Sequence, residues 1–331
     1  MANINDNNID LSTLDNSSVE NISSPILINL ESSTQTFNVK NILGLWSNNY
    51  LFLNAQSTGL SNSTINTVSG DDAINISTTA SASTSSNSWN WGVWNNNSNI
   101  NVETLGLLNS TINTGSGDDS INISTTASAS TSSNSWNWGI WNNNSNVNVE
   151  AVGIFNSTIN TGSGDDSINI NSLATNKNIS FGRLNSEDAN VSSYGVYGSS
   201  INTGSGDDSI NINSSSVSLT RDLWDWESRE IGLGQSEAVG LEKSTINTGS
   251  GDDKVEISAY SFGTITNSWA IRDSSIDTGI GNDTVILNAF DLAVSMGEAI
   301  EPAYGAVNSS INLGSGDDSL FINSSGEALS I

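Results

Sequence analysis

The chain of 331 residues contains no cysteine and no histidine, and it has only eight lysines and arginines against 35 aspartates and glutamates. Without thiols and imidazoles, it cannot form disulfides, zinc or haem sites, or cysteine and histidine catalytic centres. The net charge of −27 argues against binding to nucleic acid or anionic membranes. No apolar run approaches a membrane span, and the N-terminus lacks a basic region followed by an apolar stretch. We therefore expect neither membrane insertion nor a cleaved signal peptide.

One short motif recurs seven times, in its clearest form as Thr-Gly-Ser-Gly-Asp-Asp-Ser-Ile-Asn-Ile at residues 114–123. Its second acidic position recurs at intervals of 47, 47, 42, 45, 30 and 35 residues. Such periods are typical of solenoids and propellers. Apolar residues alternate on both sides of a Gly-rich corner, as Ile159, Ile168 and Ile170 do around Gly162 and Gly164. This pattern indicates a strand, a corner that needs positive φ or close backbone approach, and a second strand.

A single coil of this kind cannot bury its own inner face, so neighbouring coils must stack through parallel strands. A propeller would need antiparallel hairpins with large inner residues, whereas the inner positions here are Ile, Val, Ala, Thr and Ser. We predict an all-β fold, a right-handed parallel β-helix (β-solenoid) of about seven coils with three or four strand sides each. Residues 1–24 are predicted to form a polar strand or tail, residues 25–60 an N-terminal cap, and residues 61–331 the solenoid, with one Gly-Asp turn per coil.

The stacked turns would concentrate negative charge along one edge of the rod. They contain 13 of the 35 acidic residues, and like charges about 5 Å apart repel by roughly 3 kcal/mol at an effective dielectric constant near 20. Such an edge needs cations, shared protons or side chains that splay outward. Oxygen ligands without nitrogen or sulfur favour calcium, which accepts six to eight oxygens in flexible geometry.

The turn sequence resembles the calcium-binding nonapeptide of repeats-in-toxin (hemolysin-type) proteins, Gly-Gly-x-Gly-x-Asp-x-hydrophobic-x. The match is seen at residues 115–121 and is closer at 279–285, and with the flanking strands it covers about a third of the chain. The resemblance implies Ca²⁺ between stacked turns, bound by the second Asp of each turn and by glycine carbonyls. The first Asp, such as Asp118, matches a variable position and is expected to face solvent. The implied metal ligands are Asp72, Gly115, Gly117, Asp119, Gly162, Gly164, Asp166, Gly204, Gly206, Asp208, Gly249, Gly251, Asp253, Gly279, Gly281, Asp283, Gly314, Gly316 and Asp318.

The chain departs from that family in two ways. The family runs its nonapeptides in tandem, whereas this chain has one turn per coil of 30 to 47 residues, so we expect a single file of at most six ions. The first Gly of the nonapeptide is Thr in most repeats, and the first turn has Val68 where Gly is expected, which predicts a weak or empty site there. The alternative is that each turn is only a tight solenoid corner without an ion.

The first two coils are nearly identical in sequence, because residues 62–103 and 109–150 differ at only four positions. This places like residues above like and predicts a tryptophan ladder of Trp89, Trp91 and Trp94 over their counterparts 47 residues later. Alternating Trp89, Trp91, Trp136 and Trp138 are most simply packing residues of a wide coil. Trp94 and Trp141 have the opposite parity, and with Trp224 and Trp226 they are candidates for stacking against sugar rings.

Three classes of function follow from these features. The favoured one is a structural protein that assembles with other copies of itself into an extracellular fibril, sheath or surface layer, since repeats of this type occur in bacterial surface fibrils. The alternative is an adhesin or polysaccharide-binding module that uses surface tryptophans. A polysaccharide lyase or epimerase is disfavoured, because Arg221, Arg229 and Arg272 show no shared strand register with an acidic cluster; we expect no enzyme. The resemblance implies export to the cell surface or medium by a type I, signal-peptide-independent route, with folding driven by calcium outside the cell.

Overall fold

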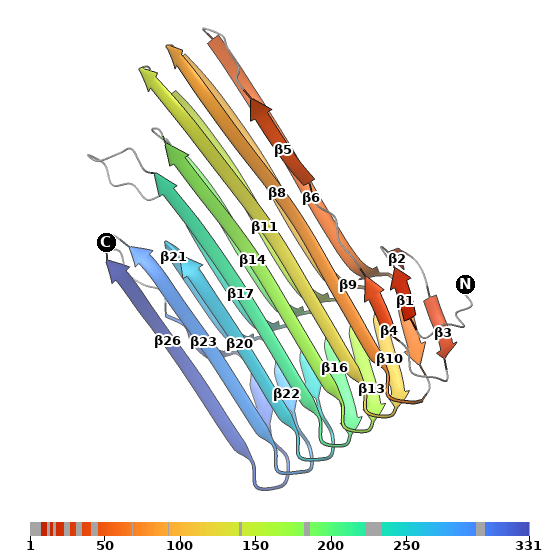
Figure 1. Ribbon diagram of the computed structural model, residues 1–331. Coiled ribbons are helices and arrows are strands. Elements are labelled where there is room, and N and C mark those ends of the chain that lie inside the picture. Colours follow the sequence, from red (N-terminus) through yellow and green to blue (C-terminus); the bar gives the residue numbers. More distant parts are fainter. Residues whose placement is uncertain are drawn as a thin grey trace.

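The structure is a computed structural model, and its secondary structure is entirely β (Figure 1). It describes residues 8–11, 14–15, 18–22, 27–30, 35–40, 46–67, 69–91, 93–138, 141–181, 186–222, 234–295 and 302–330. Side chains are described from Asn54 onward, except at positions 68, 84–98, 132–145, 179–188, 220–233, 295–301 and 329–331. Within the described residues, no helix is long and apolar enough to span a membrane.

The strands form three parallel sheets, and each coil contributes one strand to each sheet. The first long sheet, sheet A, contains β1 (Asn8–Leu11), β4 (Leu27–Leu30), β5 (Gln35–Lys40), β8 (Ala73–Trp91), β11 (Ser120–Trp138), β14 (Ser167–Phe181), β17 (Ser209–Asp222), β20 (Lys254–Gly263), β23 (Thr284–Ser295) and β26 (Ser319–Ser330). The second, sheet B, contains β2 (Leu14–Asp15), β6 (Trp46–Ser61), β9 (Val93–Leu108), β12 (Trp141–Phe155), β15 (Ser186–Tyr197), β18 (Gly234–Glu242), β21 (Ile265–Arg272) and β24 (Tyr304–Val307). The short sheet C contains β3 (Ser18–Ile22), β7 (Thr64–Thr67), β10 (Thr111–Ser116), β13 (Thr158–Ser163), β16 (Ser200–Ser205), β19 (Thr245–Asn247), β22 (Ser275–Asp277) and β25 (Ser310–Asn312).

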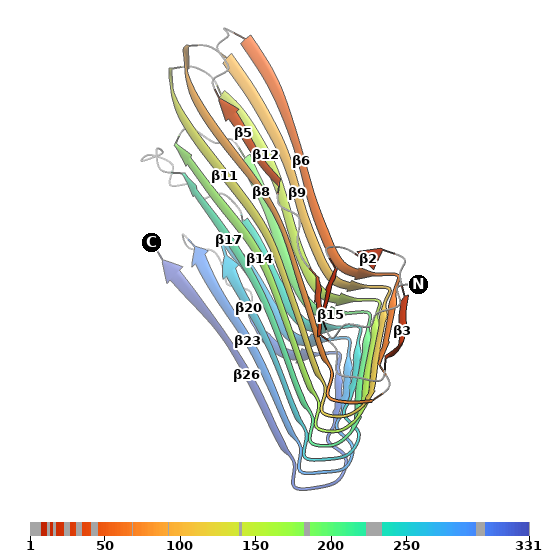
Figure 2. The ribbon, with the colours of Figure 1, turned by 45° about the vertical axis from the view of Figure 1, so that its right-hand side comes forward.

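Seven coils follow one another in the order B, C, A, from β6-β7-β8 to β24-β25-β26. The predicted parallel β-solenoid of about seven coils is therefore confirmed, with three strand sides per coil. Figure 2 shows the long strands of sheets A and B running outward from the corner that holds sheet C. The sheet A strands shorten along the rod, from 19 residues in β8 and β11 to 12 in β26.

At the N-terminal end, short strands extend all three sheets: β4 and β5 pair with β8, β3 pairs with β7, and β2 pairs with β6. β6 lies mostly within the predicted cap, yet it pairs with β9 along its length and opens the first coil. The proposed boundaries at residues 24 and 60 stay predictions.

The core at the sheet C corner is built from identical aliphatic positions in successive coils. Leu107, Ile112, Ile121 and Ile123 are at most 1% exposed in the second coil, and the other coils place equivalent side chains above and below them. Burying each such side chain contributes about 1.5–3 kcal/mol. A second, outer layer of Ala and Val, including Ala127 and Val149, fills the space between sheets A and B.

A glycine on sheet B lets the two long sheets converge beside this core. A Cβ on Gly153 would overlap the Cγ2 methyl of Ile170 on sheet A and the backbone oxygen of Gly195 in the next coil. The glycine of the hydrophobic-Gly-hydrophobic motif thus lies in a close contact between the two sheets, and the sixth coil has Ala270 at this position. At the B–C corner, the φ of Asn109, Asn156 and their counterparts lies near +47°, a left-handed conformation that asparagine tolerates.

Candidate metal centre

The Gly-Asp turns join sheet C to sheet A in every coil and stack along one edge of the rod, which lies at the bottom of Figure 1. The predicted positive φ is present: φ is +103° at Gly162 and +124° at Gly164, and the equivalent glycines of the other complete turns are similar. The structure therefore brings the predicted aspartates together as two parallel ladders, one buried and one exposed. Val68 lies outside the described residues.

The second aspartates of the turns form the buried ladder, in which each side chain bonds to the backbone of the preceding coil. The backbone N–H of Asp119 donates to Oδ1 of Asp166 (2.8 Å), and the N–H of Asp166 donates to Oδ1 of Asp208 (2.9 Å). These carboxylates are only 1–2% exposed. The other carboxylate oxygen, Oδ2, has no hydrogen-bond partner among the described residues in Asp119, Asp166, Asp208, Asp253 and Asp283.

Burial is the main cause of the pKa shifts in this ladder. It raises the pKa of Asp119, Asp166 and Asp253, and it raises that of Asp208 to about 6. Hydrogen bonds from a nearby Thr and from the backbone act in the opposite direction but are smaller, and neighbouring aspartates add to the increase. The ladder is thus a file of carboxylates that favours protons or cations.

The first aspartates form the exposed ladder, and their side chains point the opposite way along the rod. The N–H of Asp165 donates to Oδ1 of Asp118 (2.9 Å), so here each side chain bonds to the backbone of the following coil. Asp71, Asp118, Asp165, Asp207, Asp252 and Asp317 are all exposed. The expectation that Asp118 faces solvent is confirmed.

The threonine that replaces the first Gly of the nonapeptide forms a buried column beside the carboxylates. Thr114 and Thr161 are fully buried, and the hydroxyl of Thr114 donates to the backbone oxygen of Thr161 (3.2 Å). The column explains the preference for Thr, because its hydroxyl links two coils inside the rod, where glycine would leave a void.

The turn glycines bring successive backbones into close contact. A Cβ on Gly162 would overlap the carbonyl oxygen of Gly115, and a Cβ on Gly164 would overlap that of Gly117. The predicted carbonyl ligands therefore face the Cα atoms of the glycines in the next coil. The carboxylates and the carbonyls share one turn, but their joint role as calcium ligands stays a prediction.

The carboxylate side of the turn suits a hard cation, because the second to sixth coils each supply one buried oxygen without a hydrogen bond among the described residues, from Asp119, Asp166, Asp208, Asp253 and Asp283. Among the described residues, no three or more acidic side chains converge on one point. An ion here would therefore bind between two successive coils, in a file, with one carboxylate from each. This geometry agrees with a single row of sites.

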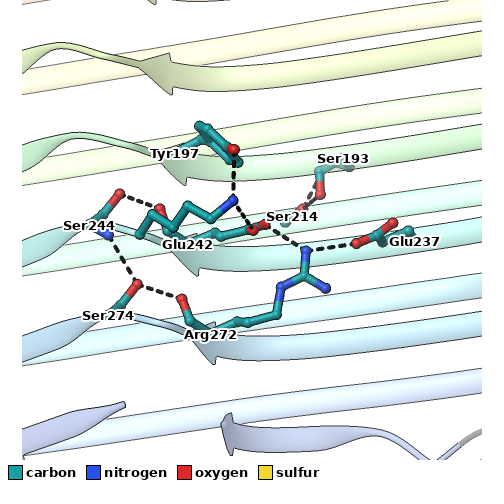
Figure 3. A network of polar contacts seen from close by, with 9 residues as sticks. Ser193, Tyr197, Ser214, Glu237, Glu242, Ser244, Arg272 and Ser274 are labelled. Carbon is teal, nitrogen blue, oxygen red and sulfur yellow. Dashed lines mark hydrogen bonds and ion pairs between the residues drawn. The ribbon is translucent and has the colours of Figure 1, made fainter. Parts of the chain in front are cut away.

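Arg272 was predicted to share no strand register with an acidic cluster, but the structure places it beside two glutamates. Arg272 follows Glu242 directly in the sheet B register, and its Nη2 atom contacts Glu242 (2.6 Å) and Glu237 (2.9 Å) (Figure 3). Trp269 stacks on the guanidinium at 4.3 Å. The 30-residue coil length brings these groups together, which could not be read before the register was known. The guanidinium joins two neighbouring coils.

The tryptophan positions are in register as predicted, with Trp136 beside Trp89, Trp138 beside Trp91 and Trp141 beside Trp94. Their side chains are not among those described, and Trp224 and Trp226 lie outside the described residues altogether. The packing and sugar-binding roles of these rings stay predictions.

No protein-family model, curated protein or solved structure matches this chain. The likeness to repeats-in-toxin proteins therefore remains a likeness of the turn motif.

Proposed function

We propose that this protein is a calcium-stabilised structural subunit that stacks end to end with other copies into an extracellular fibril, sheath or surface layer. The observation that carries the proposal is the open interior at the last coil. Val285 and Leu287 are fully buried in the sixth coil, but the residues that follow them in register, Leu320 and Ile322, are 42% and 49% exposed. Among the described residues, nothing covers this hydrophobic cross-section.

A second copy fits this end because both ends of the rod present the same three sheets. β26, β25 and β24 end sheets A, C and B at one side, and β1, β3 and β2 end them at the other. Among the described residues, no further strand pairs with the outer edges of these strands, and such edges are templates for adding another strand. A head-to-tail contact of this kind does not close on itself, so it produces a linear polymer.

Calcium would act at the buried ladder by neutralising the carboxylates between coils. Asp119, Asp166, Asp208, Asp253 and Asp283 would hold the ions through their Oδ2 atoms. Where calcium is scarce, the uncompensated charges would weaken the stack. Together with the resemblance of the turns, this supports export through a type I route and folding outside the cell.

The test is negative-stain imaging of the full chain in millimolar calcium and in chelator. We expect filaments or sheets in calcium that disperse in chelator. Replacing Ile322 by Lys places a charge on the open cross-section and should abolish them. The matched control is Leu173→Lys, because Leu173 is 37% exposed on β14 in the third coil, away from this end and from the turns. Isolated rods in both buffers, or filaments that survive Ile322→Lys, would overturn the proposal of end-to-end stacking.

The contribution of calcium has a separate readout in the thermal midpoint. Asp166→Asn removes one buried carboxylate and should reduce the calcium-dependent rise of the midpoint, whereas the exposed neighbour change Asp165→Asn should not. If the thermal midpoint of the wild-type chain is the same in calcium and in chelator, calcium does not stabilise the fold and this part of the proposal is wrong.

A further inference from the structure

One column of inward-facing residues on sheet A changes from apolar to charged along the rod. It runs through Ala80, Ala127, Ala174, Ser216 and Ser261 and reaches Asp291 on β23. Asp291 is fully buried, and its neighbour in the last coil is Gly326. A carboxylate thus stands where five preceding coils place a methyl or hydroxyl group.

Neither carboxylate oxygen of Asp291 has a hydrogen-bond partner among the described residues. The facing strand β21 carries two further groups of this kind, the buried hydroxyls of Thr266 and Ser268. Among the described residues, four buried oxygen atoms from these three residues of one coil thus have no hydrogen bond of good geometry, and the closest donors to Asp291 belong to Ser268.

The register shows that these groups face one another between sheets A and B. In the fifth coil, the hydroxyl of Ser261 donates to the backbone oxygen of Ser236 across the gap (2.8 Å). Asp291 follows Ser261, and Thr266 follows Ser236, so the carboxylate stands opposite Thr266 in the sixth coil. Ser268 faces the same carboxylate, and weak hydrogen bonding from its hydroxyl and its backbone lowers the pKa of Asp291 by less than burial raises it.

The carboxylate also lacks a compensating charge. Burial raises the pKa of Asp291 to about 6, so above that pH it is largely ionised. The ion pairs of the described residues join Lys243, Lys254 and Arg272 to glutamates, and none includes Asp291. An ionised carboxylate in such surroundings needs a cation.

We propose that Asp291, Ser268 and Thr266 bind a monovalent alkali cation, such as sodium, inside the sixth coil. The oxygen donors suit a hard cation, and the single negative charge matches a single positive one. The site is separate from the Gly-Asp turns, which lie at another edge of the coil, and it does not depend on end-to-end assembly.

The test measures the thermal midpoint of the full chain at pH 8 in saturating calcium, with sodium chloride exchanged for choline chloride at constant ionic strength. We expect the wild-type midpoint to rise by several degrees as sodium increases from about 1 mM to about 300 mM, by mass action on the folded state. Asp291→Ser copies the residue of the fifth coil and should show a flat midpoint. Sodium NMR of the wild-type protein should show line broadening that the variant lacks.

Two results would overturn the proposal. One is an equal sodium response of the wild-type chain and Asp291→Ser. The other is a wild-type midpoint independent of sodium, with no broadening of the sodium signal, which would mean that Asp291 is buried as a neutral acid. If Asp291→Ser does not fold, the NMR titration of the wild-type chain decides alone.

Discussion

The buried and the exposed aspartate ladders lie one residue apart in the same turns, yet they have opposite surroundings. The side chain of Asp166 lies inside the rod and bonds to the preceding coil, and that of Asp165 lies in solvent and bonds to the following coil. Of the two ladders, only the buried one has side chains with both an oxygen that lacks a hydrogen-bond partner among the described residues and a pKa raised by burial. Residue type alone does not create a candidate ion site. The position in the turn between β13 and β14 decides which carboxylate is buried and loses its water.

The largest effect is expected from breaking the turn that holds both ladders. Gly164 has a φ of +124°, and a Cβ there would overlap the backbone of Gly117. Gly164→Ala should lower the free energy of unfolding by about 3–5 kcal/mol, from left-handed strain and overpacking together. Urea unfolding measures this loss.

The matched control for this change is Gly198→Ala at the B–C corner. The φ of Gly198 is +60°, in a position that other coils fill with Asn, Lys or Asp, and its Cβ would meet only the side chain of Asn156. We expect a smaller loss of about 1–2 kcal/mol, from left-handed strain alone. Equal losses for the two variants would contradict the role of close backbone approach.

A smaller change in the free energy of unfolding is expected when the pH is varied in the presence of chelator. Asp208 has a folded pKa of about 6 against an ordinary value of 3.8. The folded state therefore holds this proton more tightly than the unfolded chain does, so stability falls as the pH rises between these values. From pH 4 to 7, this one residue should remove about 2.5 kcal/mol of the free energy of unfolding.

Two variants distinguish the contribution of the buried ladder to this pH dependence from that of the exposed ladder. Asp208→Asn should reduce the slope, while the other buried carboxylates with a raised pKa keep part of it, and Asp207→Asn should leave the slope unchanged. A wild-type chain that becomes more stable as the pH rises through this window would contradict the assignment.

The smallest effect is expected from the exposed ladder itself. Asp165 is exposed, and the hydrogen bonds that it makes with neighbouring turns lie at the surface. Asp165→Asn should change the free energy of unfolding by less than about 0.5 kcal/mol in either calcium or chelator. A loss above about 2 kcal/mol, measured by urea unfolding, would mean that the two ladders act as one site.

The repeat made the fold predictable, because each coil carries the same local pattern and its inner positions alternate regularly. The residue types predicted for inner positions are buried where they alternate, as at Thr125, Ala127, Val147 and Val149. The near identity of the first two coils predicted their register. Pairing between unequal coils was not predictable. The positions of Arg272 and Asp291 depend on how strands 30 to 45 residues apart align. The lengths of the segments between the Gly-Asp turns do not determine that alignment.

The opposed directions of the two ladders give the rod a polarity. Every strand runs the same way around the coil, every buried carboxylate reaches toward one end, and every exposed one reaches toward the other. A fibre built from such rods has two chemically different tips, which would capture new subunits at different rates. Growth from a labelled seed would then be faster at one tip than at the other.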